Sequence, residues 1–289
     1  MIIKLVHSVF TVAALVASLV SGQEMVHLAA QKSETLNYSM KVGNLTRTWE
    51  EITPTASLPK SAPIIVFLSG RAAPLSSEIP RDFFMPYANA DDAELVYPVG
   101  YKESWNAGGC CGDASVANVN DVAFLKALAA RVDPGHAHPI YLVGYSNGGR
   151  MAYRMACSAP GYYDGYAMAK ADPQPGCVIS KPTTILQISS VNDTEVPYKP
   201  GDTGHESPPA TVQNQRLRTA DKCGAASSTV RSGWLTYTEW DCADGSRLGF
   251  AVYSSGGHQF PPPKTYEPAA SAVAWAFFGN AKTIEPLPA

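Results

Sequence analysis

The sequence predicts an α/β fold in which a mostly parallel sheet carries helices on both faces. Short apolar segments rich in β-branched residues recur along the chain, as expected for strands that are buried on both sides. Segments with apolar residues at helical spacing alternate with these strands, which is the pattern of a parallel sheet with crossover helices. No linker divides the 289 residues, and 45% of them are hydrophobic, so we expect a single domain over residues 23–289.

The N-terminal segment, residues 1–22, is typical of an export signal. Lys4 gives it a positive start, and residues 9–20 are apolar but too few to span a bilayer. Small residues before Gln23 suit a cleavage site, whereas an uncleaved membrane anchor is the alternative. We therefore expect a monomer that is secreted (periplasmic if the source is Gram-negative) and has no stable membrane association.

The first half of the expected domain contains strands followed by a helix. Residues 23 to about 50 mix polar and apolar side chains, which favours early antiparallel strands. Continuous apolar runs predict buried strands at 63–68 and 94–98. Residues 119–132 place their apolar side chains on one helical face, and Pro134 with the glycine after it ends that helix.

The second half repeats the alternation of strand and helix. Residues 140–143 predict a buried strand, and a helical pattern follows Ser146. Two further strands are predicted at 183–189 and 249–253, and a C-terminal helix at 269–278. In such a sheet, functional groups gather at the carboxyl ends of the parallel strands.

The charge pattern argues against nucleic acid as a partner. The formal net charge is −3, and no basic stripe runs along the chain.

Six cysteines indicate an oxidising compartment and a disulfide framework. Cys223 and Cys242 bracket a segment that resembles a hairpin, so a bridge is expected there. The adjacent Cys110 and Cys111 either bond to each other or pair separately with the two remaining cysteines, Cys157 and Cys177. No C-x-x-C pair or nearby histidine spacing supports zinc, so we expect no metal.

A candidate nucleophile lies between the strand at 140–143 and the helix that follows it. Residues 144–148 read G-Y-S-N-G, with Ser146 at the centre. On a strand-to-helix turn, this G-x-S-x-G pattern exposes the serine above the sheet and places the helix N-terminus beside it. A serine in a structural Gly-rich turn is the alternative interpretation.

If Ser146 is a nucleophile, an acid and a histidine should follow later strands, in that order. Asp193 follows the strand at 183–189, and His258 follows the strand at 249–253. The histidine would take the serine proton, and the carboxylate would orient the imidazole. Glu195 and Asp202 compete with Asp193 as the acid. Three other histidines lie in polar loops with no strand before them: His136, His138 and His205.

The negative charge that develops during acyl transfer needs backbone N–H donors. One donor is expected from Asn147, directly after the nucleophile. The other is expected from Arg71, because Gly70 lets the backbone turn at the end of the strand at 63–68.

Five stretches of the sequence together resemble a family of secreted esterases, carbohydrate esterase family one, which includes poly(3-hydroxybutyrate) depolymerase-like, feruloyl and acetylxylan esterases. The resemblance covers residues 61–278, and the stretches read YLVGYSNGGRMAYRMAC, WNAGGCCG, DVAFLKAL, NDTEVPY and GGHQFPPP. It implies an α/β-hydrolase fold and hydrolysis of carboxylic esters through a serine triad, a reaction for which we expect no cofactor. By motif, Ser146 matches the nucleophile, Asp193 the acid and His258 the base.

Three positions depart from the family pattern. The family commonly has His-Gly where this chain has Ser69-Gly70 and again where it has Ser189-Ser190, and a tryptophan where it has Phe260. These departures bear on substrate preference more than on the chemistry.

Three aromatic residues flank the expected machinery and are candidates for substrate binding. Trp105 follows the strand at 94–98, and its ring would stack on a feruloyl group, a sugar or a polyester segment, with core packing as the alternative. Tyr145 and Phe260 stand beside the nucleophile and the base and would wall the pocket.

The leading hypothesis is a secreted serine esterase that forms an acyl-enzyme and acts on feruloyl or acetyl esters of plant polysaccharide. A depolymerase of short polyhydroxybutyrate is the alternative within the same chemistry. A peptidase of the same fold would need a gating domain, for which the chain shows no insert. A catalytically inactive, ligand-binding relative is a further alternative, but a binding module would not need all three triad residues.

Overall fold

The computed structural model describes residues 33–73, 78–90, 92–202, 208–262, 265–281 and 283–284. The expected export signal lies outside these residues.

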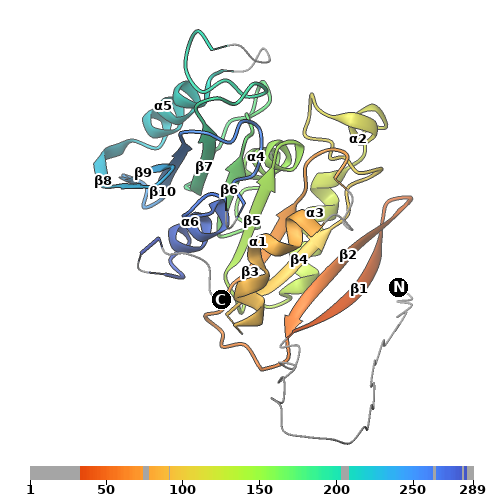
Figure 1. Ribbon diagram of the computed structural model, residues 1–289. Helices are drawn as coiled ribbons and strands as arrows, with labels where there is room; N and C mark the ends of the chain where they lie inside the picture. The colour runs from red at the N-terminus through yellow and green to blue at the C-terminus, as the bar shows by residue number, and fades with distance from the viewer. Residues whose placement is uncertain are drawn as a thin grey trace, which may run out of the picture.

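Within the described residues, ten strands form one sheet in the order β1-β2-β4-β3-β5-β6-β7-β10-β9-β8 (Figure 1). The central strands, from β4 across to β10, are parallel, whereas β1 and β2 at one edge and β8 and β9 at the other are antiparallel. The strands are β1 (Ser33–Val42), β2 (Leu45–Pro54), β3 (Ile64–Leu68), β4 (Glu94–Pro98), β5 (Ile140–Tyr145), β6 (Gly165–Ala169), β7 (Thr184–Ser190), β8 (Cys223–Ser232), β9 (Leu235–Cys242) and β10 (Arg247–Tyr253).

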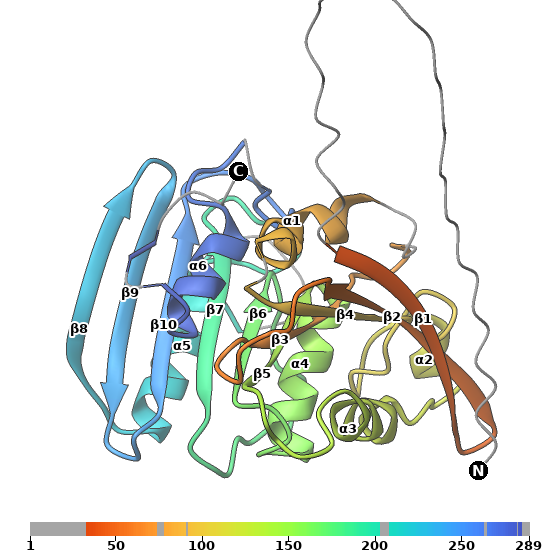
Figure 2. The same cartoon turned by 90° about the horizontal axis from the view of Figure 1, so that it is seen from below.

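Helices cover both faces of the sheet and enclose two apolar cores. Helices α1 and α6 lie on one face of the sheet, and α3, α4 and α5 lie on the other (Figure 2). Buried side chains of the first pair belong to one apolar cluster, and those of α3, α4 and α5 belong to the other. The helices are α1 (Glu78–Asn89), α2 (Gly112–Val116), α3 (Asp121–Val132), α4 (Asn147–Ser158), α5 (Ala210–Ala220) and α6 (Ala270–Phe277). The predicted fold class is confirmed. None of the described helices is long and apolar enough to cross a membrane.

The six cysteines form three disulfides: Cys110–Cys111, Cys157–Cys177 and Cys223–Cys242. The last of them joins β8 to β9, as expected from the hairpin between its two cysteines. Of the two arrangements left open for the adjacent pair, the structure has the one in which Cys110 and Cys111 bond to each other.

A buried ion pair connects the edge of the sheet to the loop that precedes α2. Arg47 on β2 donates to Asp121 at the start of α3 over 2.6 Å, and the two side chains are 4% and 0% exposed. The other carboxylate oxygen of Asp121 accepts the backbone N–H of Asn106 over 2.7 Å. The pair therefore holds the W-N-A-G-G-C-C-G loop against the core.

We expect Arg47→Met to destabilise the fold by about 3–5 kcal/mol, because it leaves the Asp121 carboxylate buried without its cation. Urea unfolding at neutral pH measures this loss. Lys41→Met, on the exposed neighbouring strand, removes a cation from the surface and should change stability by less than about 0.5 kcal/mol. Equal effects of the two substitutions would contradict a stabilising role for the buried pair.

Candidate active site

Four predicted site segments meet at the carboxyl ends of the parallel strands. Gly70 follows β3, Ser146 follows β5, Asp193 follows β7 and His258 follows β10. The strands β3 and β5 are neighbours, but the chain leaves them toward opposite sides of the sheet, to β4 and to β6. Ligand sites of open α/β sheets form at such a switch point.

Ser146 occupies a strained turn between β5 and α4. Its φ is +52°, in the left-handed region that non-glycine residues rarely adopt, and its N–H donates to Ala169 O over 2.9 Å. A Cβ at Gly144 would overlap the carbonyl of Gly148, and a Cβ at Gly148 would overlap the carbonyl of Leu68. The two glycines of the G-x-S-x-G pattern are therefore required by close backbone approach, which lets the turn lift the serine above the sheet.

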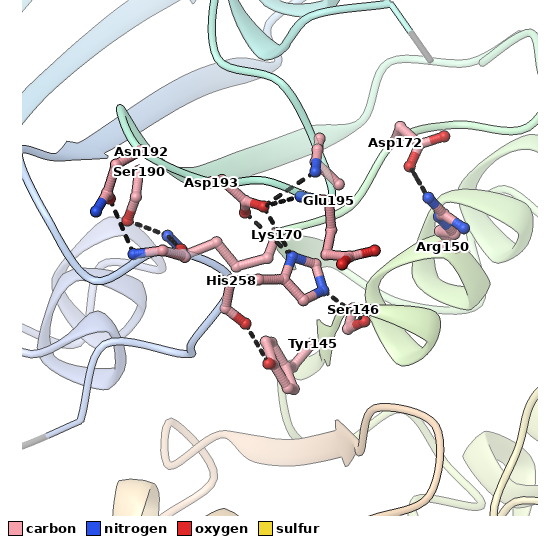
Figure 3. A network of polar contacts seen from close by, with 12 residues as sticks. Tyr145, Ser146, Arg150, Lys170, Asp172, Ser190, Asn192, Asp193, Glu195 and His258 are labelled. Carbon is pink, nitrogen blue, oxygen red and sulfur yellow. Dashed lines mark hydrogen bonds and ion pairs between the residues drawn. The ribbon is translucent and has the colours of Figure 1, made fainter. Parts of the chain in front are cut away.

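The side chains of Ser146, His258 and Asp193 form one hydrogen-bonded chain (Figure 3). Ser146 Oγ is 2.9 Å from His258 Nε2. On the other side of the ring, His258 Nδ1 is 3.0 Å from Asp193 Oδ1 and 3.1 Å from Oδ2. An imidazole that donates from Nδ1 to the carboxylate has an unprotonated Nε2 facing the serine, which is the arrangement that a general base needs.

The carboxylate of Asp193 is buried, and the loop that carries it supplies further donors. The backbone N–H groups of Glu195 and Val196 donate to Asp193 Oδ1 over 2.9 and 3.0 Å. Burial alone would raise the pKa of Asp193, but the hydrogen bonds from His258 and from these backbone groups outweigh burial and hold the pKa below its usual value. Asp193 therefore stays ionised at the pH at which a neutral His258 can accept a proton.

The two other acids considered in the sequence, Glu195 and Asp202, lie in the same loop region as Asp193. Glu195 is exposed, and its backbone supports Asp193. Asp202 accepts the N–H of Lys199 over 3.0 Å within its own turn. Among the three candidates, the contact with His258 that the structure records is that of Asp193.

Asn147 and Arg71, the expected backbone donors, flank the serine. Asn147 is the first residue of α4, where the N–H groups of a helix have no partner within the helix. Arg71 follows Gly70, at which an added Cβ would lie 3.4 Å from Ser146 Cβ. The backbone after β3 thus runs beside the nucleophile, and the assignment of these two N–H groups to an oxyanion stays a prediction.

Trp105 does not occupy the position that was expected of a substrate-stacking ring. It is 0% exposed, and its indole N–H donates to Ser69 O over 3.1 Å. The side chain of Asn147 holds its backbone on both sides, accepting from Trp105 N over 2.7 Å and donating to Trp105 O over 2.9 Å. Trp105 therefore connects the end of β3 to the start of α4. Of the two interpretations given above, core packing is the correct one.

Phe260 also departs from its expected position in the pocket wall. It is 4% exposed and packs against Phe67 and Phe83, with ring centroids 5.7 and 4.6 Å away. The ring is large and apolar, and it belongs to the apolar core that α1 and α6 cover.

Tyr145 lies at the site and is half-buried. Its hydroxyl donates to the backbone carbonyl of His258, and an added Cβ at Gly70 would lie 3.1 Å from its ring. Burial, with smaller contributions from Asp193 and Glu195, raises the pKa of Tyr145 to about 12, so it remains a neutral donor. Its place between Gly70 and His258 is compatible with the expected role in the pocket wall.

Sequence reasoning missed several polar residues that surround the triad. Lys170, after β6, donates to Ser190 and to Gly257, and Asn192 accepts from Gly257. Lys170 directly follows β6, a strand that the sequence analysis does not predict, so no sequence signal placed it at this edge of the sheet.

A second missed group lies along α4. Arg150, one turn after Ser146, donates to Asp172 over 2.6 Å and to Cys110 Sγ over 2.9 Å. It thereby links the nucleophile helix to the disulfide of adjacent cysteines. No group of three or more His, Cys, Asp or Glu side chains in the described part of the chain is arranged to hold a metal ion.

Curated relatives with esterase names match most of the chain, although no protein-family model matches it. The chain is 26% identical over 235 residues to "Putative esterase NocK" of Nocardia uniformis subsp. tsuyamanensis, covering 71% of this chain and 67% of that protein. It is 24% identical over 226 residues to "Probable feruloyl esterase C" of Aspergillus niger, covering 74% of this chain and 77% of that protein.

Solved structures share the fold at low sequence identity. An acetyl xylan esterase from Aspergillus awamori superposes with a TM-score of 0.54 at 12% identity, covering 81% of this chain and 94% of that one. A thermostable esterase superposes with a TM-score of 0.51 at 14% identity; the match covers 77% of this chain and 55% of the esterase. Together with the sheet order, these likenesses confirm the expected α/β-hydrolase fold. The curated esterase relatives support the expected enzyme class: the chain is a carboxylic ester hydrolase.

Proposed function

We propose that the protein is a secreted serine esterase that hydrolyses its substrate through an acyl-enzyme on Ser146. The observation that carries the proposal is the continuous chain of contacts from Ser146 Oγ through His258 to Asp193, at 2.9 and 3.0 Å. Secretion is supported by the export-signal pattern of residues 1–22 and by the three disulfides.

The first half of the reaction acylates the serine. His258 Nε2 takes the hydroxyl proton of Ser146 as Oγ attacks the ester carbonyl, and ionised Asp193 stabilises the imidazolium that forms. The carbonyl oxygen becomes an oxyanion, which the N–H groups of Asn147 and Arg71 would bind. The intermediate then collapses: the ester C–O bond breaks, and the leaving alkoxide takes the proton from His258.

The second half releases the acid. A water molecule gives a proton to His258 Nε2 and attacks the acyl carbon, and the tetrahedral intermediate breaks the bond to Ser146 Oγ as the proton returns to the serine. The cycle ends with the free acid and the original enzyme, and every proton transfer in it passes through His258.

We propose that the substrates are feruloyl or acetyl esters carried by plant polysaccharide. Support comes from the relative named as a feruloyl esterase and from the shared fold with an acetyl xylan esterase.

Initial rates on p-nitrophenyl acetate, methyl ferulate and a hydroxybutyrate oligomer test this proposal. We expect turnover of the first two, with the oligomer the poorest substrate. Preferred cleavage of the oligomer would replace the substrate class with a polyester, while leaving the mechanism in place. Folded protein that cleaves none of the three would leave ligand binding as the better interpretation.

A further inference from the structure

The turn that carries His258 is built from residues that do not hold a fixed conformation by themselves. It comprises residues 255–257, in which Gly256 and Gly257 have φ values of +105° and +53°. Glycine adopts such angles readily, but it also leaves them readily, because it has the widest range of backbone conformations. The proposed base must nevertheless stand within hydrogen-bond distance of both Ser146 and Asp193.

Polar side chains from two neighbouring strand ends hold this turn (Figure 3). Lys170 Nζ donates to Gly257 O over 3.0 Å, and Asn192 Oδ1 accepts from Gly257 N over 2.9 Å. Lys170 Nζ also donates to Ser190 Oγ, which in turn donates to Ser255 O over 2.9 Å. Both backbone polar groups of Gly257, the residue before His258, are thus engaged by side chains, as is the carbonyl of Ser255 two residues earlier.

Lys170 is an unusual residue for this position. Its side chain is 1% exposed, and burial lowers its pKa to about 7, opposed in part by the charge of Asp193. A buried amine costs folding free energy that an apolar side chain of the same length would not. Either protonation state keeps at least two N–H donors, so the contact with Gly257 does not depend on charge.

We propose that Lys170 and Asn192 are positioning residues. They bind the backbone carbonyl and N–H of Gly257 and thereby hold His258 between Asp193 and Ser146. The inference rests on the proposed triad and adds to it the groups that align its base. Ser190, which accepts from Lys170, adds a hydrogen bond to the carbonyl of Ser255. None of the three side chains has to touch the substrate to affect the rate, because misplacing the imidazole by about 1 Å can reduce catalysis by about 100-fold.

The test compares kcat, KM and the thermal midpoint of Lys170→Met and Asn192→Leu with those of the wild type on p-nitrophenyl acetate. We expect kcat to fall about 100-fold for Lys170→Met and about tenfold for Asn192→Leu, with KM unchanged, because the substrate contacts remain. The thermal midpoint of Lys170→Met should fall much less than its kcat suggests, because the substitution also removes the folding cost of a buried amine. Lys181→Met, which makes the same change at an exposed lysine, should behave as wild type.

Two further variants separate the hydrogen bond of Asn192 from other effects at this position. Asn192→Asp keeps an oxygen acceptor for Gly257 N–H and should retain kcat within about threefold. Thr194→Ala removes the N-glycosylation sequon formed by residues 192–194 but keeps the Asn192 side chain, so it should match wild type. Asn192 is exposed, so these variants remain informative even if Lys170→Met fails to fold.

The proton NMR signal of His258 Nδ1–H, identified by its absence in His258→Gln, reports the position of the ring without any substrate. In wild type, the hydrogen bond to Asp193 should shift this signal far downfield. In Lys170→Met and Asn192→Leu it should broaden or move upfield. Folded variants with an unchanged signal and kcat within about twofold of wild type would overturn the proposal. If wild type cleaves no ester, the proposed function fails, but the NMR signal still decides whether these residues position His258.

Discussion

Ser146→Ala should lower kcat on p-nitrophenyl acetate by about 10⁴- to 10⁶-fold, because alanine has no oxygen to form the acyl-enzyme. The structure predicts little accompanying loss of stability. The recorded side-chain contact of Ser146 is the one with His258 Nε2, and alanine has the same backbone strain at φ +52° as serine. A residual rate above that in water is expected from the backbone donors alone.

Ser158→Ala is the matched control, since it makes the same change at the exposed far end of α4 and should keep full activity. In wild type, rapid mixing should show a burst of p-nitrophenol, and mass spectrometry should place the acetyl group on the peptide that contains Ser146. An active Ser146→Ala protein, or acetylation of a different residue, would remove the nucleophile from the proposed mechanism.

Strands that are buried on both faces were the most predictable part of the fold. The apolar runs that became β3, β4, β5, β7 and β10 are continuous and rich in β-branched or aromatic residues, and the structure contains a strand at each of them. The strand β6 was missed because its sequence, GYAMA, has no β-branched residue. Helix α1 was missed because it contains Pro86 in its interior, which normally argues against a helix.

The site residues that directly follow a predicted strand were predictable. The order of Ser146, Asp193 and His258 along the chain placed them at three strand ends, and the structure brings their side chains into contact. Their catalytic roles stay predictions that the variants test.

The aromatic residues were less predictable, because an aromatic ring after a strand has the same sequence signal in a core and in a pocket wall. The core position of Trp105 is fixed by its contact with Asn147, which lies 42 residues away in sequence. Likewise, the engagement of Lys170 with Gly257 spans 87 residues. Contacts of this kind follow from the packing of the whole sheet and leave no local pattern.

The second large effect is expected from Asp193→Asn, a change of one atom. Asp193 Oδ1 accepts two backbone N–H groups, so the amide oxygen of an asparagine should take that place. The amide NH₂ must then occupy the position of Oδ2, 3.1 Å from His258 Nδ1. Because the amide is a donor there, it favours the tautomer that accepts at Nδ1 and carries its proton on Nε2, facing Ser146, over the tautomer that donates to the amide oxygen 3.0 Å away.

In that tautomer, His258 cannot take the serine proton, and kcat at neutral pH should fall by about 10⁴-fold with the fold intact. Glu195→Gln makes the same chemical change at the exposed carboxylate two residues later and should retain activity, which also settles the choice between the two acids.

The lowered pKa of Asp193 adds a condition on pH. Its folded pKa lies below the unfolded value, so its ionised form stabilises the protein above the unfolded pKa, and this contribution is lost as the pH falls through the folded pKa. Acid unfolding of wild type should therefore show a loss of stability that Asp193→Asn lacks. A pH-stability curve with the same acid limb in both proteins would mean that Asp193 is not held ionised by His258 and its loop, and the tautomer argument would lose its basis.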